Sequence, residues 1–179
     1  IGRVISVVFQ DPATALNARM TVHDQLIDPL VVHNVGDKDS REKRVQELIE
    51  MVGLPNSVLE ALPGQMSGGQ RQRVAIARAL ALSPDAIIAD EPTSALDVSV
   101  RAQILNLLMD LKHELGLSMV FISHDIQTVR YISDEIIVMN GGQAVERGTA
   151  KEVFEHPKDD YTRLLLGAAP SLLHPDLGK

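Results

Sequence analysis

Short apolar runs recur along the chain and predict β-strands. The predicted strands cover residues 4–9, 86–89, 119–122 and 136–139. The first run is typical of a strand that is buried on both faces. After the last run, Gly141-Gly142 predicts a tight hairpin into a partner strand at residues 143–146.

Between these runs, apolar residues recur at the spacing of amphipathic helices. Thr21, with Asp24 three residues later, is expected to cap one helix. Ser40 is expected to begin another after a loop at residues 35–39, and Gly53 to close it. Further helices are predicted at residues 67–82, 98–115 and 126–132, after a Thr149–Glu152 capping box, and at residues 161–166.

The alternation of apolar strands with helices indicates an α/β fold with a mainly parallel sheet. The stretch from about Ala15 to Leu80 shows only helical patterns and is interpreted as an inserted α-helical subdomain. We therefore expect core segments at residues 1–14 and 81–148, the helical subdomain at residues 15–80, and a C-terminal helical tail at residues 149–179.

Composition argues against several classes of partner. The 179 residues include 17 basic and 24 acidic ones, for a net charge of −7. Proteins that bind a phosphate backbone usually carry a basic face, so we do not expect nucleic acid as a partner. The chain has no cysteine, which excludes disulfides and thiolate metal sites. No apolar run reaches the length that spans a bilayer.

The sequence Ser67-Gly68-Gly69-Gln70 combines the signal for a helix start with two glycines that leave the backbone accessible. Serine at the N-cap and glutamine three residues later form a capping box. Two glycines leave the first N–H groups uncovered, and a helix start attracts phosphate. The four residues alone fit an ordinary capped helix equally well. The residues Arg71-Gln72-Arg73 directly after them favour the phosphate-binding interpretation.

Polar side chains end three of the predicted strands: Asp90 and Glu91, His124, and Gln10. In an open α/β sheet, ligands collect at the carboxyl ends of the strands. Adjacent carboxylates repel each other unless a cation is present, and Mg²⁺ with a nucleotide would supply one. The alternative is that the two acids merely cap the next turn. An imidazole there can hydrogen-bond a terminal phosphate or orient a water molecule, and Gln10 could reach the metal. With the glycine-rich helix start, four segments converge on one edge of the sheet.

Taken in order, these residues resemble the ATP-binding domain of an ABC transporter, which has a P-loop NTPase-like fold. Phe9-Gln10-Asp11-Pro12 resembles the Q-loop. Met66 to Gln70 resembles the signature motif, with methionine where leucine is usual. Ile87 to Glu91 resembles Walker B, Ser94 to Asp97 the D-loop, and His124 the switch histidine.

The resemblance implies an ATPase that uses ATP and Mg²⁺, in which two such domains pair head to tail. It implies that Asp90 and Gln10 hold the metal, that Glu91 is the general base, and that His124 braces the γ-phosphate. The signature residues Ser67, Gly68, Gly69 and Gln70 would contact the nucleotide of the partner domain, and Asp97 would link the two sites. It also implies that the chain lies at the cytoplasmic face of the cell membrane and binds transmembrane permease subunits, with an extracytoplasmic solute-binding protein as an indirect partner.

Two stretches suggest a branch of the family. Residues 11–22 and the tail from His156 to Leu165 resemble dipeptide and oligopeptide importers. Importers of nickel or glutathione have similar tails, so the cargo stays open between these classes.

The phosphate loop G-x-x-x-x-G-K-[ST] does not occur in the chain. In the family that loop precedes the Q-loop, so we expect it before Ile1, and we expect the sheet to lack the phosphate-loop strand. On this interpretation the chain is a C-terminal fragment of an importer ATPase and is inactive alone. Two alternatives are a non-catalytic interaction subunit and an ABC-type ATPase of DNA repair or translation.

Overall fold

The computed structural model describes residues 5–168, apart from the side chains of Pro12 and Ala13. Val4 of the first predicted strand and residues 169–179 of the predicted tail lie outside this range. The chain divides into two compact units, one ending at Ile122 and the other beginning at Ser123. The four segments expected from the sequence follow different boundaries and stay a prediction.

The first unit contains a parallel three-stranded sheet, which confirms the expected fold class. Its strands are β1 (Ile5–Val8), β2 (Ala86–Asp90) and β3 (Ser118–Ile122), in the order β1-β2-β3. Val8 pairs with Ala89, and Asp90 pairs with Ile122. Because all three strands are parallel, their carboxyl ends lie at one edge of the sheet.

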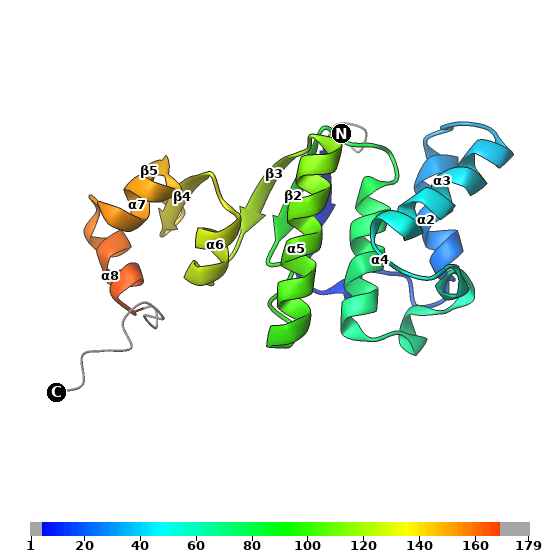
Figure 1. Cartoon of the computed structure of the whole chain (residues 1–179), viewed down its shortest axis with the longest axis horizontal. Coiled ribbons are helices and arrows are strands. Elements are labelled where there is room, and N and C mark those ends of the chain that lie inside the picture. Colours follow the sequence, from blue (N-terminus) through cyan, green and yellow to red (C-terminus); the bar gives the residue numbers. More distant parts are fainter. Residues whose placement is uncertain (1–4, 169–179) are drawn as a thin grey trace. The chain divides into compact units, whose positions relative to one another are not determined.

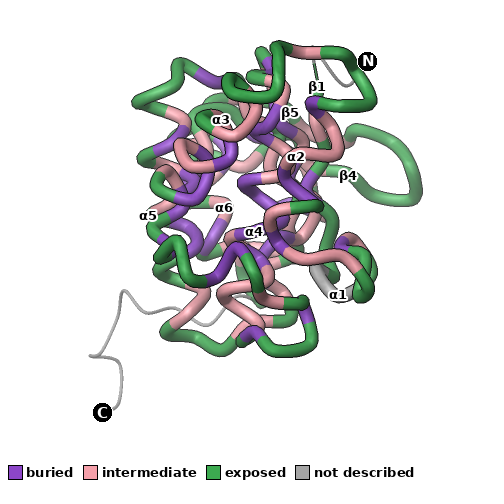
Figure 2. The backbone as a smooth tube through the Cα atoms, turned by 90° about the vertical axis from the view of Figure 1, so that its right-hand side faces the viewer, coloured by how far each residue is buried: buried purple, intermediate pink, exposed green. Residues whose placement is uncertain are grey.

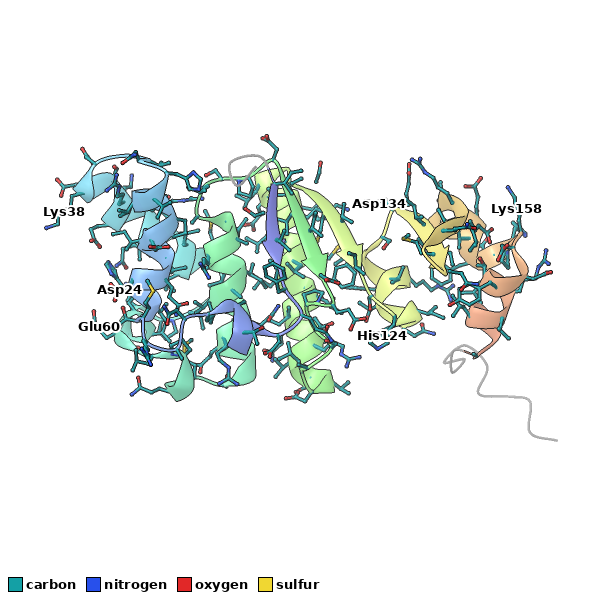
Figure 3. All side chains as sticks on the ribbon, turned by 180° about the vertical axis from the view of Figure 1, so that it is seen from behind. Asp24, Lys38, Glu60, His124, Asp134 and Lys158 are labelled. Carbon is teal, nitrogen blue, oxygen red and sulfur yellow. The ribbon has the colours of Figure 1, made fainter. Side chains whose placement is uncertain are left out.

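Helices cover one face of this sheet. The helix α5 (Val98–Leu115) crosses β2 in Figures 1 and 3, and α4 (Gly68–Leu80) packs on β1 and α5. Val8, Ile87 and Ala89 are buried, whereas Val7 is 40% exposed and Val120 is 56% exposed. The prediction that the first strand is buried on both faces is therefore wrong for the described residues. Its apolar run is continuous, but the helices of this unit lie on one side only.

The remaining helices of the first unit form a bundle around α4. They are α1 (Pro12–Ala15), α2 (Val22–Val32) and α3 (Lys38–Met51), with short 3₁₀ turns at Asn56–Glu60 and Pro63–Gln65. Figure 2 shows buried segments along α2 and α4. The core of the bundle consists of fully buried aliphatic side chains, among them Leu26, Leu30, Leu48, Ile49 and Ile76.

Capping residues fix where these helices begin. The Thr21 hydroxyl accepts the N–H of Asp24 at 3.1 Å, as predicted. The helix α3 begins at Lys38 rather than at Ser40, so the predicted loop at residues 35–39 is too long. Asp37 is the N-cap: its carboxylate accepts the Ser40 N–H at 2.9 Å and the Ser40 hydroxyl at 2.6 Å. Asp37, three residues upstream, is therefore the N-cap in place of Ser40, and Ser40 donates hydrogen bonds to it.

Guanidinium groups hold the carboxyl ends of two helices in the bundle. Arg73 of α4 donates to the Val52 carbonyl, at the end of α3, over 2.6 Å. Arg44 of α3 donates to the Leu80 carbonyl, at the end of α4, over 2.9 Å. The last carbonyls of a helix have no partner within the helix, so each bond satisfies a group that would otherwise need water.

The second unit contains an antiparallel hairpin and three helices. The strands β4 (Glu135–Asn140) and β5 (Gln143–Thr149) are joined at Gly141-Gly142, both of which have positive φ. The predicted hairpin is confirmed, and β5 extends three residues beyond the predicted end. The helices are α6 (Ile126–Ile132), α7 (Ala150–Glu155) and α8 (Asp160–Ala168). None of the helices in the described part of the chain combines the length and hydropathy that a bilayer crossing requires.

A histidine links α2 to α3 and should make the stability of the bundle depend on pH. His23 Nε2 lies 2.8 Å from Glu42 Oε2, and Nδ1 lies 3.5 Å from Asp24 Oδ1. The hydrogen bond with Glu42 raises the pKa of His23 above its ordinary value of 6.5, against an opposing effect of burial. Because the folded-state pKa is the higher one, protonated His23 stabilises the fold below the unfolded pKa. This contribution is lost as the pH rises through the folded-state pKa.

We expect His23→Gln to lower the free energy of unfolding by less than about 1 kcal/mol near pH 6, because the ion pair is partly exposed. At about pH 8.5 the effect should be smaller, because a larger fraction of His23 is neutral at the higher pH. Urea unfolding of both proteins at the two pH values measures the difference. Glu42→Gln is the matched variant and should remove most of this pH dependence, with Asp24 left to act on His23. An equal effect of His23→Gln at both pH values would contradict the prediction.

Candidate functional site

Two predicted site residues meet at the carboxyl edge of the sheet. Gln10 stands two residues beyond the Val8–Ala89 pair on β1, and Glu91 two residues beyond it on β2. Gln10 Nε2 donates to Glu91 Oε2 over 3.4 Å. The parallel register therefore brings an amide and a carboxylate from segments 81 residues apart to one point.

The backbone of Glu91 adopts the left-handed conformation, with φ of 45°. For a residue other than glycine this costs on the order of 1 kcal/mol. Hydrogen bonds on both sides hold it there: its N–H donates to the Ile122 carbonyl over 2.9 Å, and its own carbonyl accepts the Ser94 N–H over 3.2 Å. The chain thus turns sharply at Glu91 as it leaves β2.

Asp90 is the last residue of β2 and is half-buried. Side chains alternate along a strand, so Asp90 lies on the face of Ile88, opposite the face on which Ala89 packs against the helices. Within residues 5–168 there is no group of three or more His, Cys, Asp or Glu side chains that could hold a metal ion. Asp90, Glu91 and Gln10 supply two carboxylates and an amide, a donor set that fits Mg²⁺ when phosphate oxygens complete its coordination.

The start of α4 forms the predicted capping box. The Ser67 hydroxyl accepts the Gln70 N–H at 3.2 Å, and the Gln70 side chain accepts the Ser67 N–H at 2.9 Å. The first N–H groups of a helix have no partner within the helix, so those of Gly68 and Gly69 stay available as donors. Together with the positive end of the helix dipole, this geometry fits a phosphate group.

The second glycine also has a packing role that sequence reasoning missed. A Cβ atom at position 69 would lie 2.6 Å from Val100 Cγ1, on the first turn of α5. At position 68 a Cβ would lie 3.4 Å from Leu96 Cδ2, an ordinary contact. Gly69 therefore lets the starts of α4 and α5 approach each other. Nothing local in the sequence signals this contact, because its two sides are 31 residues apart.

Asp97, predicted to link two sites, is the N-cap of α5. Its side chain accepts the Val100 N–H at 3.0 Å and the Ser99 hydroxyl at 2.8 Å. These hydrogen bonds, that from Val100 first, hold the pKa of Asp97 below its ordinary value. Asp97 and Gly69 therefore flank the same junction, where α4 and α5 begin.

His124 belongs to the second unit and is exposed in the turn between β3 and α6 (Figure 3). The next residue, Asp125, caps α6 by accepting the Gln127 N–H at 3.1 Å and the Thr128 hydroxyl at 2.8 Å. The predicted role of His124 beside Glu91 stays a prediction. Within the first unit, the predicted residues lie at two places. Gln10 contacts Glu91 at the sheet edge, where Asp90 ends β2 on the other face. Residues 67–70 lie at the start of α4, beside the start of α5 that Asp97 caps.

Comparisons with known proteins agree with these motifs. A family model described as ABC transporter matches residues 1–94. The dipeptide transport ATP-binding protein DppF of Escherichia coli is 51% identical over 172 residues, which make up 96% of this chain and 51% of that protein. The oligopeptide transport ATP-binding protein OppF of Streptococcus mutans is 52% identical over 164 residues, or 91% of this chain and 53% of that protein. The chain spans about half the length of the curated relatives it matches.

A solved structure shares the fold. The dimeric ATP-binding cassette MJ0796, in a post-hydrolysis state with ADP and Pi, superimposes with a TM-score of 0.70 at 36% sequence identity. The match covers 82% of this chain and 63% of the other. The family model takes in 94 of the 179 residues. The strand-end positions of Gln10 and Glu91 agree with it. The chain belongs to the ABC transporter family.

Proposed function

We propose that the chain is part of the ATP-binding subunit of an ABC importer and couples ATP hydrolysis to the uptake of peptides or similar small solutes. The contact between Gln10 and Glu91 carries this proposal, because it joins a candidate base to a candidate sensor of the nucleotide. The high identity to DppF and OppF supports peptides as the cargo.

The cluster at the sheet edge would perform the chemistry. Glu91 would accept the proton of the attacking water, and Asp90 and Gln10 would hold Mg²⁺. Bound Mg²⁺ neutralises charge on the phosphates during phosphoryl transfer. The fixed backbone of Glu91 keeps its carboxylate at one place, which favours a general base that must stay within hydrogen-bond reach of the water. Gln10 would report the state of the site through its contact with that carboxylate.

The cluster at the start of α4 would serve a second ATP-binding domain. Ser67, Gly68 and Gly69 would donate to the terminal phosphate of an ATP held by that domain, and Gln70 keeps Ser67 in place through the capping box. Asp97 would lie in the same interface. His124 would hydrogen-bond the terminal phosphate of the nucleotide beside Glu91.

The complete protein would act at the cytoplasmic face of the cell membrane, bound to transmembrane permease subunits. A solute-binding protein outside the membrane would deliver the cargo to those subunits. The acidic balance of the chain gives no support to nucleic acid as a partner.

Uptake by cells tests the proposal. The complete protein is expressed in cells that lack the ATP-binding subunits of their own peptide, nickel and glutathione importers, together with its membrane subunits. Restored uptake of labelled dipeptides or tripeptides is the expected result. Restoration of nickel or glutathione uptake alone would show that the cargo is that solute and not peptides. Failure to restore uptake of any of the three would contradict the importer function.

The 179 residues alone are expected to bind ATP weakly, with a Kd above about 1 mM. The reason is that the chain contains no G-x-x-x-x-G-K-[ST] loop, whose N–H groups and lysine hold the phosphates. Calorimetric titration with ATP and Mg²⁺ measures the affinity, and an ABC ATP-binding domain that has the loop is the control. Micromolar binding by the 179 residues would contradict this prediction.

A further inference from the structure

A single side chain joins the helix of the signature motif to the segment that follows Gln10. Arg78 lies near the end of α4, and its Nη1 donates to the carbonyl of Ala15 over 2.7 Å. Ala15 is the last residue of α1, which begins two residues after Gln10. The bond therefore spans 63 residues and connects the two parts of the proposed mechanism.

The segment from Gln10 to Ala15 is closed by its own hydrogen bonds. The Asp11 carbonyl accepts the N–H groups of Thr14 and Ala15, at 3.2 Å and 3.1 Å. It also accepts the Thr14 hydroxyl at 2.9 Å. Because the turn is closed in this way, a displacement of the Ala15 carbonyl would be passed to Asp11, the residue next to Gln10.

Beyond Ala15 the chain is anchored to α2. The Asn17 N–H donates to Gln25 Oε1 over 2.9 Å, and Gln25 Nε2 donates to the Met20 carbonyl over 3.3 Å. The Gln25 side chain is only 2% exposed. This second anchor holds the segment to the bundle, whereas Arg78 ties it to α4 itself.

Arg78 is half-buried. Its side chain lines a groove of about 390 Å³ between β1, the end of α1 and α4, together with apolar residues that include Val7, Phe9 and Leu16. A charged donor forms a stronger hydrogen bond to a carbonyl than a neutral donor does.

The helix α4 would carry a displacement from this bond to its other end. Arg78 and Ser67 are eleven residues apart on one helix, or about 16 Å at the α-helical rise. The helix α4 packs against α1, α2, α3 and β1, and a packed helix can carry a displacement along its axis. A shift of the Gln10 segment would therefore reach the N–H groups of Gly68 and Gly69.

We propose that Arg78 is a positioning residue that couples the position of Gln10 to that of the signature motif. The proposal rests on the proposed function, because it assigns the coupling to an ATP site and to membrane subunits. Arg78 would act through its hydrogen bond to Ala15, without being a ligand of nucleotide or metal. Arg73 makes a bond of the same kind from the same helix, but to the Val52 carbonyl at the end of α3. It therefore provides a matched control.

The test uses the complete protein assembled with its membrane subunits. Arg78→Met removes the donors and keeps an apolar side chain in the groove, and Arg73→Met is the control. We measure ATP hydrolysis by the ATP-binding subunit alone, and its stimulation when the membrane subunits and the loaded solute-binding protein are added. Arg78→Met is expected to keep the unstimulated rate within about threefold and to lose at least about fivefold of the stimulation, within the usual range of coupling between sites. Arg73→Met is expected to keep the stimulation.

Arg78→Lys distinguishes the loss of the hydrogen bond to Ala15 from a general disturbance of the packing around position 78. Lysine keeps the charge and an ammonium group that can donate but is shorter than arginine, so it should restore part of the stimulation lost in Arg78→Met. Stimulation that is unchanged in both Arg78 variants would overturn the coupling role and leave the proposed function intact. If the unsubstituted assembly hydrolyses ATP without any stimulation, the proposed function and the coupling role both fail.

Hydrogen exchange gives a second measurement that does not depend on turnover. Arg78→Met should speed exchange in peptides covering residues 10–16 and also in those covering residues 67–71. Arg73→Met should speed it near Val52 only. Faster exchange at residues 10–16 without any change at residues 67–71 would show that α4 does not carry the displacement, and it would overturn the proposal even if Arg78→Met reduced stimulation.

Discussion

Replacement of Glu91 by glutamine is expected to lower ATP turnover by the complete protein at least about 100-fold, the contribution typical of a general base. ATP binding should be nearly unchanged, because the amide keeps the size of the carboxylate and can still accept the Gln10 hydrogen bond. Steady-state hydrolysis and equilibrium binding of ATP, measured on the same preparation, separate the two effects.

Glu114→Gln is the matched control for this substitution. Glu114 is an exposed residue of α5, so the same chemical change there should leave turnover unaltered. Turnover by the Glu91 variant within a few-fold of the parent would remove Glu91 from the role of base. A loss of ATP binding that parallels the loss of turnover would instead assign Glu91 to binding.

Gly69→Ala is expected to lower the free energy of unfolding by about 1–3 kcal/mol, the usual cost of forcing extra atoms into a packed contact. The added Cβ would lie 2.6 Å from Val100 Cγ1, and a β-branched side chain has little freedom to turn away. This cost opposes the gain that alanine normally gives over glycine within a helix. Urea unfolding measures the net effect.

Val100→Ala removes the methyl groups that cause the clash. We therefore expect Gly69→Ala to cost much less in a Val100→Ala background, which gives a coupling energy between the two positions. Gly64→Ala is a control without neighbours, because no atom lies within 4 Å of the added Cβ. Additive effects of the two substitutions would show that the close approach of α4 and α5 does not explain the glycine.

Features with local causes could be predicted from the sequence. The capping boxes at Ser67 and Thr149 and the hairpin at Gly141-Gly142 depend on residues within a few positions of each other. The predicted start of α3 is wrong because Asp37 and Ser40 both suit an N-cap, and in the structure the Asp37 carboxylate accepts the Ser40 N–H. The spacing of apolar residues does not show which of two possible N-cap residues begins a helix.

Features that depend on long-range packing could be predicted only in part. The strand-end positions of Gln10 and Glu91 followed from the parallel sheet, but their hydrogen bond depends on the register of β1 against β2. The packing of Gly69 on Val100 and the bond from Arg78 to Ala15 depend on where α4 lies in the bundle. The exposure of Val7 on β1 could not be predicted either, because a continuous apolar run does not show on how many faces a strand is covered.

The left-handed backbone of Glu91 places two demands on one position. Glycine would adopt this conformation without cost, and asparagine would do so more readily than glutamate. Either residue would relieve the strain and remove the carboxylate. On the proposed role of Glu91 as general base, selection for stability and selection for hydrolysis would favour different residues at position 91.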